Sequence, residues 1–136
     1  MQKMDPLFIV WNEKNNLNVP ILDEQHRGIV SIINSLHYSV KQGKGFSALL
    51  PTIIMMEQYS IIHFEAEQFL LEKYEYPDSK NHFLLHARLR ENLREIKTQS
   101  FMSKDTDAVI DFLKSWWINH INVEDKKHAK WMGTLK

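Results

Sequence analysis

The sequence predicts an all-α protein, an antiparallel up-down-up-down four-helix bundle preceded by an extended N-terminal arm. Apolar residues recur with helical spacing in four segments, and none of these segments shows the sustained apolar and polar alternation of a β-strand. The breaks between the segments are short and rich in turn-forming residues, which favours antiparallel neighbours. A chain of 136 residues is the size of one domain, so we expect a single domain over residues 1–136.

The expected arm, residues 1–22, contains asparagine, proline and isolated apolar residues rather than a periodic pattern. We expect the first helix over residues 23–42, because Asp23 is a good N-cap residue and Gly43 follows the last periodic position. The second helix is expected over residues 47–74, with Pro51 tolerated close to its first turn and Pro77 just beyond its end.

The third helix is expected over residues 79–98 after a cap at Asp78, and the fourth over residues 105–121 after Ser103. The basic tail beyond the fourth helix is expected to form a short C-terminal turn. The apolar positions of the first, third and fourth helices are expected to face the core: Ile29, Val30, Ile33, Leu36 and Val40; Leu85, Leu89, Leu93 and Ile96; Val109, Ile110, Leu113 and Trp116.

Composition excludes several classes of function. Lys plus Arg and Asp plus Glu each number 17, so the net charge is zero and neither a nucleic acid nor an anionic membrane is an expected partner. The chain has no cysteine, so any metal site must use nitrogen and oxygen ligands. The apolar run from Leu7 to Trp11 is too short for a signal-peptide core or a membrane span, and we expect a cytoplasmic protein.

Histidine falls on the apolar face of all four predicted helices. At about 100° per residue, two residues that are four apart project within about 40° of each other. His63 and Glu67 form such a pair, on a stripe shared with Met56, Leu70 and Tyr74. The residues with metal-binding side chains that point inward in this projection are His26, His63, Glu67, His82, His86 and His120.

A single inward histidine is usually a core residue with a satisfied hydrogen bond. Five imidazoles and a carboxylate without a compensating centre would leave many buried polar atoms unsatisfied, each at a cost of about 1 to 3 kcal/mol. Metal ions remove that cost, and bundle cores are where such sites are assembled. His37 lies roughly 16 Å along the first helix from His26, too far to join, and is expected to pack or hydrogen-bond at the end of the bundle.

Asp125 is not selected by helical geometry. It follows His120 by five residues, which places it about 140° around a regular α-helix. It could join the inward cluster only if the helix ended or distorted near Asn122.

Four motifs, taken in order, resemble those of single-domain bacterial hemerythrins. They are D-E-Q-H at Asp23–His26, H-F-E-A-E at His63–Glu67, H-F-L-L-H at His82–His86 and W-W-I-N-H-I-N-V-E-D at Trp116–Asp125. The segment F-I-V-W-N from Phe8 also matches the arm of bacterial members. The resemblance extends from about Phe8 to Trp131 and implies the same four-helix fold.

The resemblance further implies a non-haem di-iron centre with an oxo or hydroxo bridge. In this reading His82, His86 and His120 bind one iron, His26 and His63 bind the other, and Glu67 and Asp125 bridge the two. The ligand count leaves one position open on the iron with two histidines, where dioxygen binds reversibly. Small anions such as azide bind the diferric form.

We therefore expect a dioxygen-binding protein for storage, delivery or scavenging, and not an enzyme. Alternatives are a sensor of oxygen, nitric oxide or iron, and a di-iron oxidase, although ferritin-like oxidases use carboxylate-rich Glu-x-x-His sites. A zinc or manganese hydrolase is formally compatible with these ligands. Relatives of this size include monomers and no exposed apolar seam is evident, so we expect a monomer.

Apolar residues near the centre are expected to exclude water and protons from it: Phe64, Leu113, Trp116 and Ile121. Many relatives have Trp-Leu where this chain has Trp116-Trp117. Trp117 is expected either to line the dioxygen pocket or to fill the neighbouring helix interface.

Overall fold

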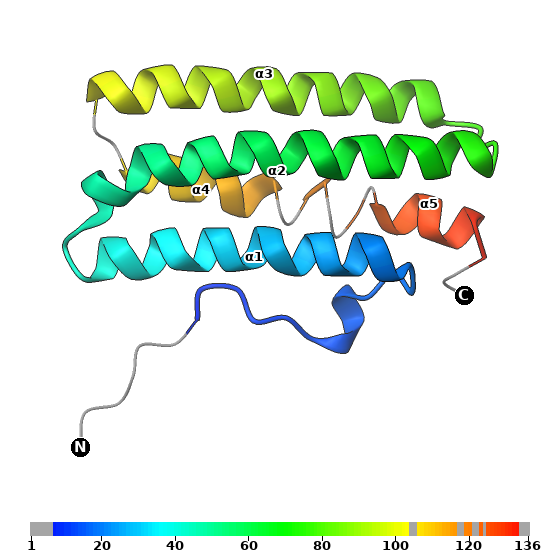
Figure 1. The fold of residues 1–136 in the computed structure, drawn as a ribbon, viewed down its shortest axis with the longest axis horizontal. Helices are drawn as coiled ribbons and strands as arrows, with labels where there is room; N and C mark the ends of the chain where they lie inside the picture. Colours follow the sequence, from blue (N-terminus) through cyan, green and yellow to red (C-terminus); the bar gives the residue numbers. More distant parts are fainter. Residues whose placement is uncertain (1–6, 104–105, 117–118, 121–122, 124, 134–136) are drawn as a thin grey trace.

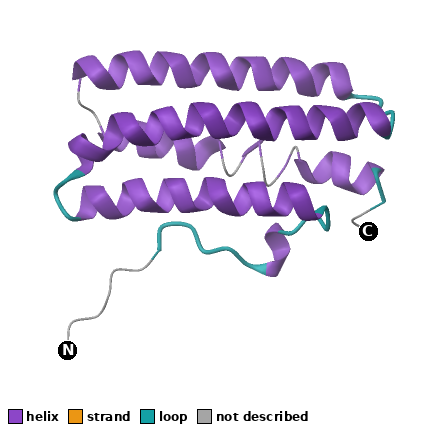
Figure 2. Cartoon of the chain, in the orientation of Figure 1, coloured by secondary structure: helices purple, strands orange, loops and turns teal. Residues whose placement is uncertain are grey.

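The chain folds into a bundle of helices (Figures 1 and 2). A computed structural model describes residues 7–103, 106–116, 119–120, 123 and 125–133. These residues contain helices and turns and no β-strand. Within the same residues, no helix combines the length and apolar character that a membrane span requires. The helices, in chain order, are η1 (Glu13–Asn15), α1 (Pro20–Lys41), α2 (Gly45–Lys73), α3 (Ser79–Ser103), α4 (Thr106–Trp116) and α5 (Asp125–Trp131).

Helices α1 to α4 form the antiparallel up-down-up-down bundle that the sequence predicts. Each helix packs on its neighbours in a ring, α1 on α2, α2 on α3, α3 on α4 and α4 on α1. Figure 1 shows α2 in front of α4, with α1 and α3 on either side. The apolar faces meet in the centre, and the residues buried there include Ile29, Ile33, Leu36, Ile53, Met56, Leu93, Val109, Ile110 and Leu113.

The N-terminal arm is held along α1 by specific contacts. The backbone N–H of Ile9 donates to Asn34 Oδ1, and Asn34 Nδ2 donates to the Ile9 carbonyl, both at 2.8 Å. Phe8 stacks on His37, with ring centroids 4.4 Å apart. His37 therefore packs at the end of the bundle away from the other histidines, as predicted.

The first helix begins at Pro20 rather than at Asp23, so the prediction that Asp23 is its N-cap was wrong. The N-cap is Val19, which makes no side-chain capping bond, and Pro20 occupies the first turn, where its missing N–H and fixed φ are favourable. Asp23 instead accepts a 2.7 Å hydrogen bond from the backbone N–H of Leu17. It thus fixes the turn by which the arm enters α1.

The second and third helices are longer than expected. α2 begins at Gly45, two residues early, so Pro51 lies in its second turn rather than its first. α2 ends at Lys73, and Tyr74 is its C-cap with 48% of its surface exposed, so the inward position predicted for Tyr74 was wrong. α3 continues to Ser103 instead of ending at residue 98, because no glycine or proline interrupts the chain there.

The expected fourth helix, residues 105–121, is interrupted. α4 ends at Trp116, and Asn119, His120 and Val123 have π-helical conformation before α5 begins at Asp125. Residues 117–118, 121–122 and 124 lie outside the described part of the chain. The predicted C-terminal turn is α5, a helix of seven residues whose Ala129 packs with Leu17 and Leu22.

Candidate metal centre

The bundle core brings together all seven residues that the sequence and the resemblance single out. α1 supplies His26, α2 supplies His63 and Glu67, and α3 supplies His82 and His86. His120 comes from the π-helical segment and Asp125 from the first position of α5. Each residue is at most 4% exposed.

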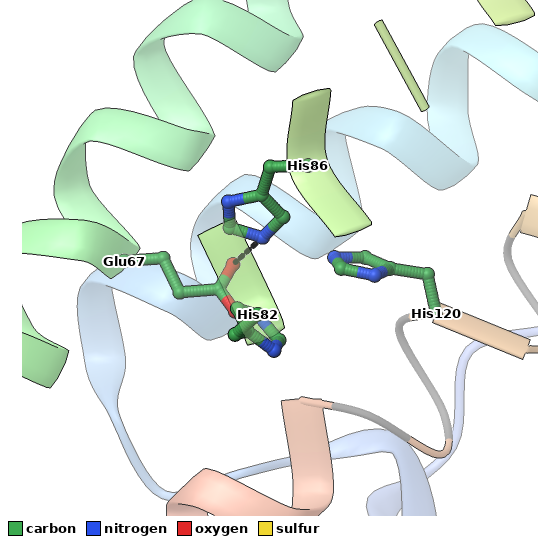
Figure 3. A group of neighbouring side chains, drawn as sticks. All are labelled: Glu67, His82, His86 and His120. Carbon is green, nitrogen blue, oxygen red and sulfur yellow. Dashed lines mark hydrogen bonds and ion pairs between the residues drawn. The ribbon is translucent and has the colours of Figure 1, made fainter. Parts of the chain in front are cut away.

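These side chains form two groups whose potential ligand atoms lie within 4.8 Å of one another. The first group is Glu67, His82, His86 and His120, and the second is His26, His63 and Asp125. Figure 3 shows the first group: Glu67 reaches from α2 toward the two α3 histidines, and His120 approaches from the opposite side.

Asp125 lies between the two groups, with one carboxylate oxygen toward each. Its Oδ2 is 3.0 Å from Nε2 of His26 and 3.6 Å from Nε2 of His63. Its Oδ1 is 3.5 Å from Nε2 of His82 and 3.3 Å from Nε2 of His120. A carboxylate in this position can bridge two metal ions.

Glu67 also contacts both groups. Its Oε2 is 3.1 Å from Nε2 of His63 in the second group and 3.5 Å from Nε2 of His86 in the first. Its Oε1 pairs with Nε2 of His82. The two carboxylates therefore stand side by side between five imidazoles.

The π-helical segment explains why regular helical geometry did not select Asp125. A π-helical turn closes hydrogen bonds from residue i to residue i+5, so residues five apart fall close to one face. His120 and Asp125 have this spacing, and the segment at Asn119, His120 and Val123 turns both toward the core. Asp125 was expected to join the inward cluster only if the helix ended or distorted near Asn122. The π-helical residues His120 and Val123, on either side of Asn122, show such a distortion.

A close approach of α1 and α2 places His26 beside His63. Gly28 makes it possible, because a Cβ at this position would overlap the hydroxyl of Tyr59 on α2. The His26 and His63 rings meet edge to face, with centroids 4.8 Å apart.

The pKa values of four histidines are shifted in two directions, according to how closely the two carboxylates approach each ring. Burial lowers the pKa of His63 and His82, but hydrogen bonds and charges from Asp125 and Glu67 outweigh it and raise these pKa values to about 9 and about 10. For His86 and His120 burial dominates: it lowers the pKa of His120 to about 4 and also lowers that of His86. Because coordination requires neutral imidazole, metal uptake must displace protons from His63 and His82.

The donor set fits a pair of metal ions. Nε2 of His86 and Nε2 of His120 are buried without a hydrogen-bond partner among the described residues, although carboxylate oxygens lie 3.5 and 3.3 Å away. Such atoms cost free energy unless a ligand satisfies them. Five imidazoles and two carboxylates, with no thiolate, suit iron, zinc or manganese.

Gln25 is a site residue that sequence reasoning missed. Its Oε1 accepts a 2.9 Å hydrogen bond from Nδ1 of His63, which leaves Nε2 of His63 directed at the carboxylates. Such outer hydrogen bonds fix the tautomer and the orientation of a ligating histidine. The signal was present, since Gln25 directly precedes His26 in the D-E-Q-H motif, but a helical projection does not show which partner an amide will meet.

Aromatic residues cover the three-histidine group. Phe64 stacks on His86 with centroids 3.9 Å apart and meets the edge of His120 at 5.8 Å. Trp116, which meets the Phe64 ring, and Leu113 are also buried, as expected. Ile121 and Trp117 lie outside the described residues, so the roles predicted for them remain predictions.

A cavity of about 320 Å³ reaches His120 from the groove between α3 and α4. Four apolar and four polar side chains form its walls. The lining residues are Leu85, Leu89, Asn92, Phe112, Ser115, Trp116, Asn119 and His120.

Comparison with known proteins agrees with this geometry. Residues 17–131 match the family model of the hemerythrin HHE cation binding domain. The chain is 30% identical over 118 residues to a bacteriohemerythrin of Pseudomonas aeruginosa, covering 86% of this chain and 76% of that protein. It is 31% identical over 124 residues to a hemerythrin-like protein of Naegleria gruberi, covering 91% of this chain and 87% of that protein.

The fold is similar to that of solved hemerythrins. Crystal structures of two hemerythrin mutants superpose with a TM-score of 0.79, covering 93% of this chain and 98% of theirs, at 24% and 23% sequence identity. At this identity the likeness concerns the fold alone, whereas the family model spans most of the chain, including every residue of the two groups. The chain belongs to the hemerythrin family.

Proposed function

We propose that this protein binds dioxygen reversibly at a di-iron centre, for storage, delivery or scavenging in the cytoplasm, and that it is a binding protein rather than an enzyme. Di-iron oxygen binding is the general property of the family to which the chain belongs. The observation that carries the proposal to these residues is the position of Asp125, whose two oxygens face different histidine groups at 3.0 and 3.3 Å.

In this proposal His82, His86 and His120 would hold one iron, and His26 and His63 would hold the other. Glu67 and Asp125 would bridge the two irons, as their contacts with both groups allow. The two-histidine group has one imidazole fewer and so leaves a coordination position for a small ligand, dioxygen or an anion such as azide. When bound, the two ferrous ions supply the electrons that dioxygen takes up and returns.

The chain's own residues keep the site dry and fixed. Phe64 and Trp116 cover part of the three-histidine side, beside the cavity that reaches His120, and their apolar surfaces limit the access of water and protons there. Gln25 holds His63 in the tautomer that presents Nε2 to the metal. Five of the seven proposed ligands are imidazoles and two are carboxylates, whereas the oxidase sites of ferritin-like proteins are rich in carboxylates.

Metal and gas stoichiometry test the proposal. Protein purified after expression with supplied iron should contain two irons per chain and, once reduced, should take up one dioxygen per pair of irons and release it under argon. One zinc per chain, no bound metal, or consumption of dioxygen without release would contradict it.

A further inference from the structure

Helix α2 is apolar on two opposite faces, and the bundle covers only one of them. The inner face carries His63, Glu67 and Met56, which are fully buried. Away from this inner face, α2 carries large apolar side chains that stay exposed. We call this set the α2 stripe; its members are Phe46 (55% exposed), Leu50 (38%), Ile54 (46%), Ile61 (39%), Ile62 (59%) and Phe69 (65%).

The α2 stripe is large enough for a stable interface. Six side chains of this size and exposure present on the order of 600 Å² of apolar surface, the upper end of what a typical monomer leaves in one patch. A standard interface buries about 800 Å² per partner, and in homodimers about 65% of that area is apolar. The stripe alone supplies an apolar area of this size.

Four of the six residues of the α2 stripe have another stripe residue at the mirrored position along the helix. If a second α2 lies antiparallel with the two-fold axis beside Glu57 and Gln58, Phe46 lies opposite Phe69 of the second copy. Ile54 then lies opposite Ile61, whereas Leu50 lies opposite Glu65 and Ile62 lies opposite Ile53, which is buried in the core. A two-fold interface requires such a self-complementary surface.

The charges around the α2 stripe are compatible with the same arrangement. Glu57, next to the axis, would lie opposite Gln58 of the second copy and close to the second Glu57, but Lys97 already binds its carboxylate at 2.8 Å within the chain. At the ends of the interface, exposed Lys44 comes near exposed Glu72 of the second copy, an attractive pair.

We propose that the α2 stripe is the interface of a symmetric homodimer in which the two α2 helices pack antiparallel. This inference does not depend on the proposed dioxygen binding, and it replaces the expectation of a monomer. The sequence hid the stripe because apolar residues on both faces of a helix do not reveal which face turns inward.

Sedimentation velocity on the full-length, metal-loaded protein tests the dimer. The wild-type protein should sediment as a dimer at micromolar concentration. Ile54→Glu or Ile61→Lys should each raise the dissociation constant at least about 100-fold, because two unpaired charges would be buried per dimer. Leu84→Glu is the matched control, since Leu84 is 66% exposed on α3, and that variant should stay dimeric.

The double variant Ile54→Glu with Ile61→Lys tests the register. In the antiparallel pair each new glutamate faces a new lysine of the second copy, so dimerisation should return. Failure of the double variant to dimerise, with an unchanged circular dichroism spectrum, would overturn the antiparallel arrangement. A wild-type monomer at all concentrations would overturn the dimer, and binding of that monomer to phosphatidylglycerol vesicles would assign the stripe to a membrane surface instead.

Discussion

Glu67 and Asp125 distinguish one coupled centre from two separate sites, because each carboxylate contacts both histidine groups. Replacing Glu67 with glutamine keeps the shape but removes the negative charge that would bridge the ions. We expect Glu67→Gln to lose the coupled pair of irons and reversible oxygen binding. Glu65→Gln, an exposed position on the same helix, is the control and should behave as wild type. Normal reversible oxygen binding by Glu67→Gln would falsify the bridging role.

Gln25 acts through His63 and should affect metal binding without contacting a metal. Gln25→Met keeps the volume but leaves Nδ1 of His63 without its acceptor. We expect metal affinity to fall about 10- to 100-fold. The metal-free protein should also lose about 1 to 3 kcal/mol of unfolding free energy. Competition with a chelator and denaturant titration measure the two effects.

The control for Gln25 is Gln68→Met, since Gln68 is exposed on α2 and forms a long, 3.4 Å hydrogen bond with Glu72. Equal metal affinity in the Gln25 and Gln68 variants would show that the hydrogen bond to His63 does not support the site.

Trp117 is the residue for which two predicted roles remain open. If its indole narrows access to the centre, Trp117→Leu should speed azide binding to the diferric protein and shorten the life of the oxygenated form. Stopped-flow kinetics and autoxidation half-lives measure these effects. Unchanged kinetics with a lower melting temperature would assign Trp117 to packing.

The π-helical segment between α4 and α5 is the element that aligns His120 with Asp125. Deleting Val123 shortens their spacing from five residues to four, and four residues span about 40° of a regular α-helix. We therefore expect the deletion variant to retain metal, with α4 and α5 joined. Inserting an alanine after Val123 gives a spacing of six and should reduce bound iron to at most one per chain.

Iron content and circular dichroism of the two length variants test this account of the segment. Two irons per chain in the insertion variant would mean that the π-helical turn is not what brings the carboxylate into the core.

At the level of the whole chain, periodicity was sufficient for the fold class and for the inward position of six candidate ligands, because such side chains on a helix obey the same spacing as the core. Element boundaries were harder. Asp23 has the chemistry of a cap, yet Pro20 is equally suited to a first turn, and in the structure Asp23 accepts a hydrogen bond from the backbone N–H of Leu17 instead of capping α1.

Features that depend on contacts between elements were not predictable. The π-helical turn forms so that Asp125 reaches histidines from three other helices, and helical spacing alone argues against it. The partner of Gln25 lies on another helix, 38 residues away along the chain. The α2 stripe became visible only when the bundle showed which face of α2 it buries.

The optical spectrum of the reduced protein through cycles of air and argon tests the central claim most directly. We predict a visible charge-transfer band that rises on exposure to air, disappears on degassing and returns in the next cycle. A spectrum that never changes would mean that the seven residues hold a redox-inactive metal such as zinc. A band that forms once and does not reverse would mean that the centre consumes dioxygen rather than carrying it.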